Sequence, residues 1–290
     1  MVSRNTLLTA GGAALALAAL AACAPADETA APTASASASA STCTPATLQT
    51  KTAGKLTIGT DNPVYEPWFS DNKPSNGKGF ESAVAYQVAQ RLGYPAESVT
   101  WVSVTFNNAI APGPKSFDFD INEFSITDDR KKAVDFSSPY YLVRQTVITT
   151  KGSKIANAKS IAELQSAKLG AQVGTTSYQA ITDLIKPSTK PSVFNNNDDA
   201  KAALVNGTVD GIVVDLPTAF YMTGAELKNG LIVGQLPQVG VPEQFGLVLD
   251  KGSPLTGCVS GAVDQLRNDG TLQVLEKTWL AQTGGAPELQ

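Results

Sequence analysis

The sequence predicts an α/β protein built as two successive lobes with largely parallel sheets. Stretches with the alternating pattern of β-strands are interleaved with stretches of helical period, which is typical of sheets flanked by helices. This alternation runs through residues 55–145, begins again over residues 150–240, and is followed by a C-terminal return. Strand-like connections between two lobes leave a cleft, and open α/β sheets bind ligands beyond the carboxyl ends of their strands.

The first block opens with a strand at Lys55–Thr60, KLTIGT, which runs into a polar loop that contains proline. A helix follows, with apolar residues on one face and a glycine stop. These residues are Phe80, Val84, Val88, Leu92 and Gly93. Three β-rich segments complete the block: Val99–Phe106, Phe117–Ile126 and Tyr141–Thr150.

The second block begins with a capping box, Ser160 with Glu163, which predicts the start of a helix. The elements expected after it are a strand at Leu169–Gly174, a helix from near Thr176, a helix near Asp199–Asn206 ended by Gly207, and strands at Val209–Asp215, 231–236 and 245–250. The C-terminal return contains an amphipathic helix. Its apolar positions are Leu255, Cys258, Val259, Ala262, Val263 and Leu266.

The N-terminal residues 1–22 have the pattern of a secretory signal peptide, with a positive charge at Arg4 before an apolar run. The run ends in LAAC, which resembles the lipobox of bacterial lipoproteins and implies lipid attachment to Cys23 after cleavage. Cleavage at an ordinary A-x-A-like site nearby is the alternative. Residues 23–47 lack large apolar side chains, so they cannot bury enough surface to offset the loss of chain entropy. We therefore expect this segment to be a flexible tether. No later segment is long and apolar enough to span a bilayer.

Composition and charge narrow the class of partner. The formal net charge is −4 with a pI near 5.0, so nothing favours nucleic acid or an anionic membrane surface as a partner. Histidine is absent, which removes the commonest general base and metal ligand, and we expect no metal or cofactor. With Cys23 lipidated, Cys43 and Cys258 remain as an even pair, and we expect a disulfide between them. Two buried free thiols are the alternative.

Polar residues follow the strands where a binding cleft is expected. Asp61, Ser125, Thr175 and Asp215 lie at or just past the carboxyl ends of strands. Arg130 carries a fork of donors that suits a carboxylate, whereas Asp215 suits an ammonium group. An anion-binding pole and a cation-binding pole in one cleft match the zwitterionic head of an α-amino acid.

Motifs along residues 55–280 resemble those of the bacterial extracellular solute-binding proteins, family 3, which serve ABC importers. The matching stretches, in order, are IGTDNPVYEPWF, SITDDRKKAVDFSSPYY, VGTTSYQAI, NGTVDGIVVDLPTA and LRNDGTLQVLEKTWL. The resemblance implies the two-lobed periplasmic-binding-protein fold of type II. This fold has two mixed or parallel sheets, helices on both faces, and a hinge of two crossover strands. Lobe 1 would comprise residues 48–145 and 241–290, and lobe 2 residues 146–240.

The resemblance also implies roles for the head-group residues. Arg130 would pair with the ligand α-carboxylate, helped by Ser125 and, from the second lobe, by Thr176. Asp215 would hold the α-ammonium. Thr175 is a further candidate for ligand contact, although its position also suits a helix N-cap.

A second set of residues would shape the side-chain pocket. Asp61, Tyr65 and Trp68 belong to this set, and Phe124 is a further candidate. The alternatives are a turn cap for Asp61 and a place in the core for Tyr65 and Trp68. Glu123 stands where the family often has serine or glycine, and the loop from Asp61 to Tyr65 is one residue longer than usual. A cleft rich in carboxylates favours a polar or cationic amino acid.

The function implied is ligand capture without catalysis. A monomeric lipoprotein on the outer face of the cell membrane would close its hinge on an amino acid and deliver it to an ABC permease. The same fold also supports other functions. One is an enzyme, such as a dehydratase or a peptidoglycan lyase, and another is a ligand sensor for a membrane receptor.

Overall fold

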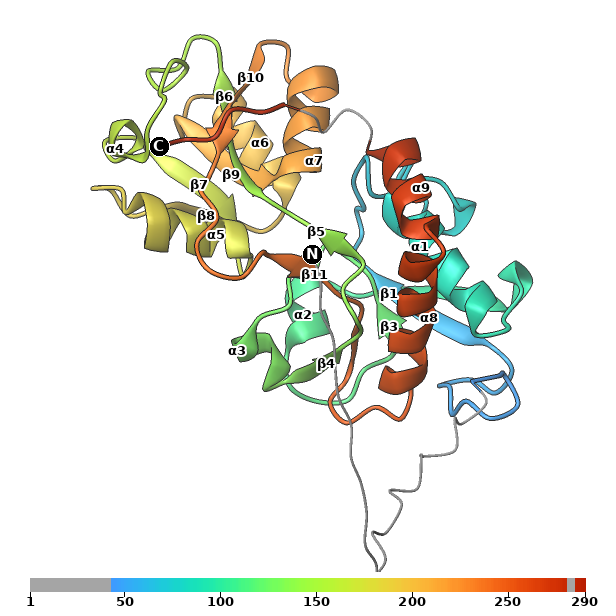
Figure 1. Ribbon diagram of the computed structural model, residues 1–290. Helices are drawn as coiled ribbons and strands as arrows, with labels where there is room; N and C mark the ends of the chain where they lie inside the picture. The colour runs from blue at the N-terminus through green and yellow to red at the C-terminus, as the bar shows by residue number, and fades with distance from the viewer. Residues whose placement is uncertain (1–42, 281–284) are drawn as a thin grey trace, which may run out of the picture. The chain divides into compact units, whose positions relative to one another are not determined.

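The first five-stranded sheet defines the first lobe of the computed structural model, which describes residues 43–280 and 285–290 (Figure 1). The strand order is β2-β1-β3-β12-β4. Strand β1 pairs in parallel with β2 and β3, whereas β12 runs antiparallel to β3 and β4. The bounds are β1 Leu56–Thr60, β2 Val99–Ser103, β3 Phe119–Asp120, β4 Val134–Phe136 and β12 Val248–Asp250.

The second sheet repeats this plan in the second lobe, with the order β10-β6-β9-β7-β8. Strand β7 is parallel to β8 and β9, and β6 runs antiparallel to β9 and β10. The bounds are β6 Gln145–Thr150, β7 Leu169–Gln172, β8 Ser192–Phe194, β9 Gly211–Asp215 and β10 Gly230–Gln235. Both sheets are therefore mixed, with three adjacent parallel strands in each.

Two short strands join the lobes. Strand β5, Tyr141–Leu142, pairs antiparallel with β11, Gln244–Phe245. Strand β5 leads into β6 of the second sheet, and β11 leads back into β12 of the first. The hinge of two crossover strands and the two-lobed α/β fold are thus confirmed.

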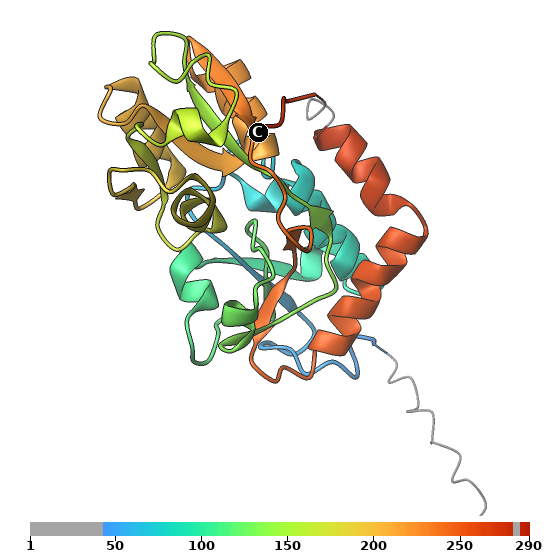
Figure 2. The same ribbon diagram turned by 60° about the vertical axis from the view of Figure 1, so that its left-hand side comes forward.

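Helices cover both sheets. Those of the first lobe are α1 Phe80–Arg91, α2 Phe106–Ile110, α3 Asp128–Lys131, α8 Thr256–Asn268 and α9 Thr271–Trp279. Those of the second are α4 Ile161–Leu164, α5 Thr176–Ala180, α6 Asn197–Val205 and α7 Leu216–Tyr221. Helices α1, α8 and α9 pack together on one side of the first sheet (Figures 1 and 2). The apolar faces predicted for α1 and α8 are the buried ones.

Four strand predictions were too long or merged two strands. Residues 99–106 leave the strand after Ser103, and Phe106 begins α2. Of residues 117–126, only Phe119–Asp120 is a strand, because the backbone turns at Glu123, whose φ of 53° is left-handed. Residues 141–150 divide into β5 and β6, and residues 245–250 divide between β11 and β12.

The two lobes have different cores. In the first lobe, the aromatic rings of Trp68, Phe80, Tyr140, Tyr141 and Phe245 pack at tilted and edge-on angles beneath α1. The second sheet is covered by two aliphatic clusters, one on each face. Neighbouring residues of one strand belong to different clusters, as alternation along a strand requires.

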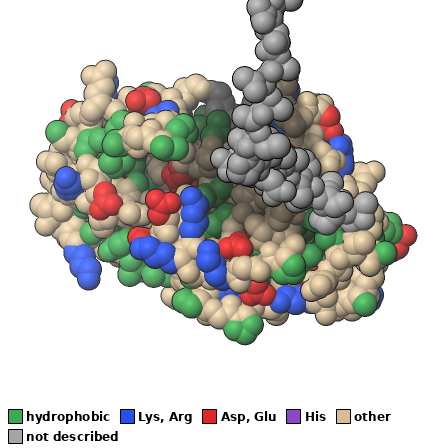
Figure 3. Space-filling model, turned by 60° about the horizontal axis from the view of Figure 1, so that its bottom comes forward, with side chains coloured by type: hydrophobic (Ala, Val, Ile, Leu, Met, Phe, Trp, Pro, Cys, Tyr) green, Lys and Arg blue, Asp and Glu red, His purple; other side chains and the backbone are tan. Residues whose placement is uncertain are grey.

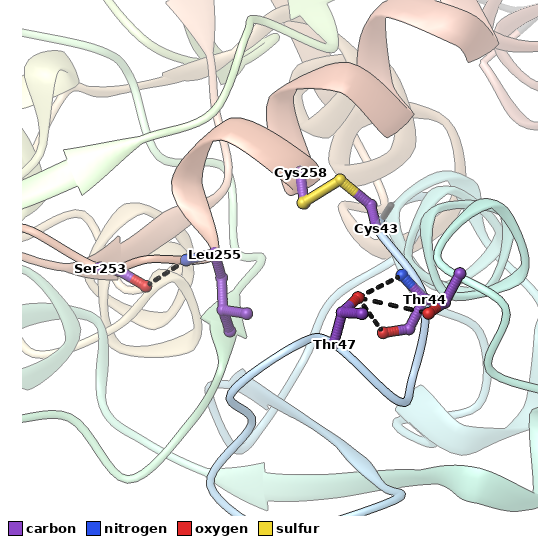
Figure 4. Close-up of a disulfide and its surroundings, with 6 residues drawn as sticks. All are labelled: Cys43, Thr44, Thr47, Ser253, Leu255 and Cys258. Atoms are coloured by element: carbon purple, nitrogen blue, oxygen red, sulfur yellow. Dashed lines mark hydrogen bonds between the residues drawn. A yellow bond between two sulfur atoms is a disulfide. The ribbon is translucent and has the colours of Figure 1, made fainter. Parts of the chain in front are cut away.

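The predicted disulfide is confirmed. Cys43 is bonded to Cys258 of α8, with a Cα–Cα distance of 5.6 Å and a sequence separation of 215 residues (Figure 4). Next to it, Thr47 N donates to Thr44 O at 2.9 Å in a turn, so ordered structure begins before Leu48, within the segment expected to be a tether.

The chain ends on the second lobe. Leu289 is buried among residues of the second core, and Gln235 forms a parallel bridge with Glu288. Glu288 also forms an ion pair with Arg144, N to O 2.7 Å. Residues 285–290, assigned from the sequence to lobe 1, therefore contact lobe 2 (Figures 1 and 2).

The predicted signal peptide 1–22, Cys23 and the rest of the tether up to residue 42 lie outside the described residues. No helix within the residues that are described is long and apolar enough to cross a membrane. On the face shown in Figure 3, basic and acidic side chains are interspersed.

Candidate functional site

A cavity lies between the lobes, beyond the carboxyl ends of strands from both sheets. Asp61 follows β1, Glu123 follows β3, Gln172 ends β7 and Asp215 ends β9. The full lining is Asp61, Pro63, Tyr65, Phe106, Asn122, Glu123, Gln172, Thr175, Thr176, Ser177, Asn197, Val214 and Asp215. The position is the one that α/β topology predicts for a ligand.

The cleft is closed in this conformation. The cavity has a volume of about 40 Å³. Hydrogen bonds join the lobes directly: Ser125 Oγ and Thr176 Oγ1 are 3.1 Å apart, and Trp68 Nε1 donates to Thr218 Oγ1 at 2.8 Å. Thr218 Oγ1 in turn donates to Glu123 Oε2 at 3.3 Å.

Arg130 is held at the closed interface by backbone carbonyls. Helix α3 begins at a Thr127 cap that accepts from Arg130 N. The guanidinium donates to Ser125 O at 2.7 Å and, across the cleft, to Gly174 O at 3.0 Å. It lies 5.3 Å from the centre of the Phe106 ring. Burial lowers the pKa of Arg130 to about 10, so the group stays charged near neutral pH.

Three carboxyl groups form a chain that reaches the cavity: Glu81 is fully buried, and Glu123 and Asp215 are partly buried. Glu81 Oε1 accepts from Glu123 N at 2.7 Å and from the Tyr140 hydroxyl. Burial raises the pKa of Glu81 to about 7. Burial, and then the charge of neighbouring acids, raises the pKa of both Glu123 and Asp215 well above the usual range. These shifts favour the protonated form of the three groups, whereas an added cation would favour their ionised form.

Asp120 is another fully buried acid of the first lobe. Neither of its carboxyl oxygens has a hydrogen-bond partner among the described residues. Burial raises its pKa well above the usual range. Gly59 makes room for it, since a Cβ there would lie 2.3 Å from Asp120 Oδ2. No group of three or more metal-ligating side chains is found within residues 43–280 and 285–290.

Six of the residues predicted for the site line the cavity: Asp61, Tyr65, Glu123, Thr175, Thr176 and Asp215. Asp61 also caps local backbone, because its oxygens accept from Asn62 N at 2.7 Å and Phe106 N at 3.1 Å. Thr175 is the N-cap of α5 and accepts from Tyr178 N. Asp61 and Thr175 therefore both cap the local backbone, as the alternative predicted, and also line the cavity.

The remaining predicted residues do not line the cavity. Trp68 is fully buried in the aromatic core of the first lobe, so the core alternative describes it. Phe124 is also buried, stacked on Phe106 at 4.7 Å between ring centres, and Phe106 is the ring that faces the cavity. Ser125 and Arg130 lie beside the cavity, at the interlobe contact.

Sequence reasoning missed Gln145 and Glu243 of the two crossover segments, and Glu81 of α1. Gln145 Nε2 donates to Asp215 Oδ1 at 2.7 Å and lies 3.2 Å from each carboxyl oxygen of Glu243. Ser125 Oγ donates to Glu243 Oε1 at 2.5 Å. No spacing or motif in the sequence brings residues so distant to one point; the folded hinge does.

Comparison with known proteins places the chain among solute receptors. Residues 56–282 match the model of the bacterial extracellular solute-binding proteins, family 3. The chain is 28% identical over 219 residues to the ABC transporter glutamine-binding protein GlnH of Bacillus subtilis (strain 168), covering 74% of this chain and 77% of that protein.

Two solved structures are similar in sequence and fold. The ancestral amino acid-binding protein AncCDT-1, a precursor of cyclohexadienyl dehydratase, is 33% identical with a TM-score of 0.65, covering 78% of this chain and 95% of that one. An ancestral arginine-binding protein bound to arginine is 31% identical with a TM-score of 0.64, covering 78% of this chain and 98% of that one.

Proposed function

The chain belongs to the bacterial extracellular solute-binding proteins, family 3, and on that premise we propose that it is the substrate-binding protein of an ABC amino-acid importer. It captures an amino acid between its lobes and delivers it to a permease in the membrane. Amino acids with polar or cationic side chains are favoured. The relatives that match are named for binding glutamine and arginine, which supports this class of ligand.

One observation carries the proposal: Glu123 and Asp215, from opposite lobes, line the same cavity and are both partly buried. A buried carboxylate is costly unless a cation pairs with it. The ammonium group of an amino acid, placed between the two, would provide that cation. Closure of the hinge would then bring the second carboxylate onto the ligand.

The opposite pole of the ligand belongs near Ser125 and Thr176. Their hydroxyl groups come from different lobes and meet at 3.1 Å, and the Arg130 guanidinium lies at the same interlobe contact. Hydroxyl groups and a guanidinium fork are suited to a carboxylate. A free α-amino acid would therefore span the cleft, with its two charges on groups of matching sign.

The charge balance favours a cationic side chain. Beyond Glu123 and Asp215, the first lobe supplies Asp61 at the cavity wall and Glu81 behind it. A guanidinium or amine would relieve the repulsion among these acids, whereas an acidic side chain would add to it.

Capture would be a shift between open and closed forms. The ligand stabilises the closed form only through contacts that this form alone offers, here those from Thr176 and Asp215 of the second lobe. We further propose that a lipid on Cys23 anchors the protein to the outer face of the cell membrane. It would work as a monomer beside its permease and need no metal or cofactor.

Calorimetric titration of the full chain tests the binding function. The panel is L-arginine, L-lysine, L-histidine, L-glutamine, L-glutamate and L-aspartate. We expect the basic amino acids and glutamine to bind more tightly than the two acidic ones. Tight binding of glutamate alone would overturn the proposed preference, and the absence of any binding would overturn the function itself.

A dehydratase-like enzyme is the second candidate, because desolvation raises the pKa of Glu123, which is the kind of shift that a general acid needs. One similar structure is described as a precursor of cyclohexadienyl dehydratase. Incubation with a cyclohexadienyl substrate and detection of the aromatic product decides between the two. We expect no turnover, and turnover that is lost in Glu123→Gln would establish the enzyme.

A further inference from the structure

The carboxylate of Glu243 lies where the proposed function places the α-carboxylate of the ligand. It accepts from Ser125 Oγ at 2.5 Å, and Ser125 Oγ is 3.1 Å from Thr176 Oγ1. These are the two hydroxyl groups that come from opposite lobes. Its negative charge also acts on Arg130, where it offsets part of the effect of burial on that residue's pKa. A second carboxylate cannot share this position without strong repulsion.

Gln145 fixes this arrangement from the other side. Its Oε1 accepts from Ser177 Oγ at 2.6 Å, so its amide nitrogen faces the acids. Nε2 is 2.7 Å from Asp215 Oδ1 and 3.2 Å from both oxygens of Glu243. One amide thus connects Asp215, the residue proposed for the ligand ammonium, with Glu243.

Glu243 belongs to a segment with few anchors. Its carbonyl accepts from Val143 N at 3.0 Å, just before β11. The loop that precedes Glu243 contains two strongly exposed side chains. The exposed fraction is 71% for Val239 and 83% for Val241. The side chain of Glu243 is therefore attached to the folded protein mainly through the hydrogen bonds of its own carboxylate.

A second cavity provides room for this side chain elsewhere. It has a volume of about 230 Å³ and is lined by Arg144, Gln145, Thr176, Gln179 and Glu243, among others. Arg144 Nε is buried and has no hydrogen-bond partner among the described residues, while Arg144 Nη2 donates to Leu236 O and Glu288 Oε2. An unpaired buried donor beside an open space favours an incoming acceptor.

We propose that Glu243 is an internal competitor for the ligand α-carboxylate and has two positions. In one, it occupies the hydroxyl pair of Ser125 and Thr176, as seen here. In the other, it turns into the second cavity and accepts from Arg144 Nε, while the ligand carboxylate takes its place. The inference rests on the proposed function. Glu243 then determines how much an α-carboxylate contributes to affinity.

The test compares amino acids with their decarboxylated forms. Wild-type and Glu243→Gln full chains are titrated with L-arginine and agmatine, L-lysine and cadaverine, and L-histidine and histamine. Glutamine keeps the size and the acceptor oxygen of Glu243 and removes its charge. We expect Glu243→Gln to bind the amino acid at least tenfold more tightly, about 1.4 kcal/mol. The amine without a carboxylate should show no such gain.

A second pair of variants tests the outward position. Arg144→Gln should weaken amino-acid binding in the wild-type background and have no effect in the Glu243→Gln background. Glu288→Gln removes the ion pair of Arg144 with the C-terminal residues and serves as the matched control, expected to leave affinity unchanged. Thermal unfolding of each variant confirms that it is folded.

The outcomes separate the inference from the function it rests on. If wild type binds a basic amino acid and Glu243→Gln binds it equally or less tightly, Glu243 is a structural part of the hinge and the inference fails alone. An equal gain for the amine would also overturn it. If wild type binds no member of the panel, the proposed function fails and the inference falls with it.

Discussion

The first sheet contains the strand series β2-β1-β3-β12 and the second the series β8-β7-β9-β6, and in each series three parallel strands are followed by one antiparallel strand. In both lobes, this antiparallel strand is the one that directly follows a hinge strand along the chain, β12 after β11 and β6 after β5. The backbone plan of the two lobes is therefore shared, and the cavity lies at equivalent strand ends of both.

Their chemistry differs. In the first lobe, Glu81 and Asp120 are fully buried, and Glu123 is partly buried at the cleft. The second lobe adds one acid, Asp215, among hydroxyl and amide groups such as Thr176 and Gln172. Two lobes with the same strand arrangement can therefore carry different charges at the cleft. The first lobe provides most of the acidic groups, and closure brings Asp215 of the second lobe to them.

Removal of the disulfide should produce the largest effect, a loss in the free energy of unfolding of the first lobe alone. Cys43 and Cys258 close a loop of 215 residues, and loss of such a crosslink costs about 4 kcal/mol. The change is Cys43→Ser with Cys258→Ser, measured by urea unfolding. All three tryptophans, residues 68, 101 and 279, lie in segments of the first lobe, so their fluorescence reports on it. A loss below about 1 kcal/mol would contradict the expectation.

Replacement of an acidic residue in the first lobe should weaken the binding of a basic amino acid more than replacement of a neutral polar residue in the second lobe. We expect Glu123→Gln to weaken the binding of a basic amino acid by about 100-fold, because loss of one partner of a desolvated charge pair costs about 2–5 kcal/mol. Gln172→Met, at the equivalent wall of the second lobe, should cost less than about tenfold. Calorimetric titration measures both, and equal losses would remove the proposed asymmetry.

The affinity for a basic amino acid should rise with pH. Burial raises the pKa of Glu123 and Asp215 well above the usual range and that of Glu81 to about 7. Since a cation favours the ionised form, its binding releases protons, and fewer must be released as the pH rises. We expect about tenfold tighter binding of arginine at about pH 7.5 than at about pH 5.5.

Calorimetry in two buffers with different ionisation enthalpies measures the released protons directly. Glutamine, whose side chain is neutral, is the matched ligand and should show a smaller dependence. An arginine affinity that is flat or falls with pH would show that the acids are already ionised in the free protein.

The smallest effect is expected at the contact between the lobes. Thr218→Val removes the acceptor for Trp68 Nε1 and the donor to Glu123, which disfavours the closed form by about 1 kcal/mol and weakens binding about fivefold. Thr223→Val is the matched control, because its hydroxyl bonds only within its own helical segment. Equal affinities of the two variants would mean that this bond does not help closure.

Local pattern was sufficient for the elements with strong periodicity. The buried faces of α1 and α8, the N-cap at Thr175 and the Cys43–Cys258 pair follow from spacing and residue type. The loop after β3 was less predictable, because its alternating residues look like a strand until the left-handed turn at Glu123. An alternating pattern does not reveal where a backbone turns.

Contacts between residues far apart in the sequence explain the parts of the site that could not be predicted. Trp68 is aromatic and lies close in sequence to Asp61 and Tyr65, which line the cavity. Its ring nevertheless packs in the core of the first lobe, and its indole nitrogen donates to Thr218 of the second lobe. Glu243 comes to Ser125 because Phe245 of β11 forms an antiparallel bridge with Ser125. Contacts of this kind depend on how the two lobes meet, which no window of sequence contains.

The position of the last residues has a practical consequence for reporter design. Leu289 is buried in the second lobe, although helix α9, just before it, packs on the first. A fluorescent protein fused after Gln290 would therefore move with the second lobe. An energy-transfer sensor of ligand capture would need its other dye on the first lobe, for example at the exposed Val274 of α9.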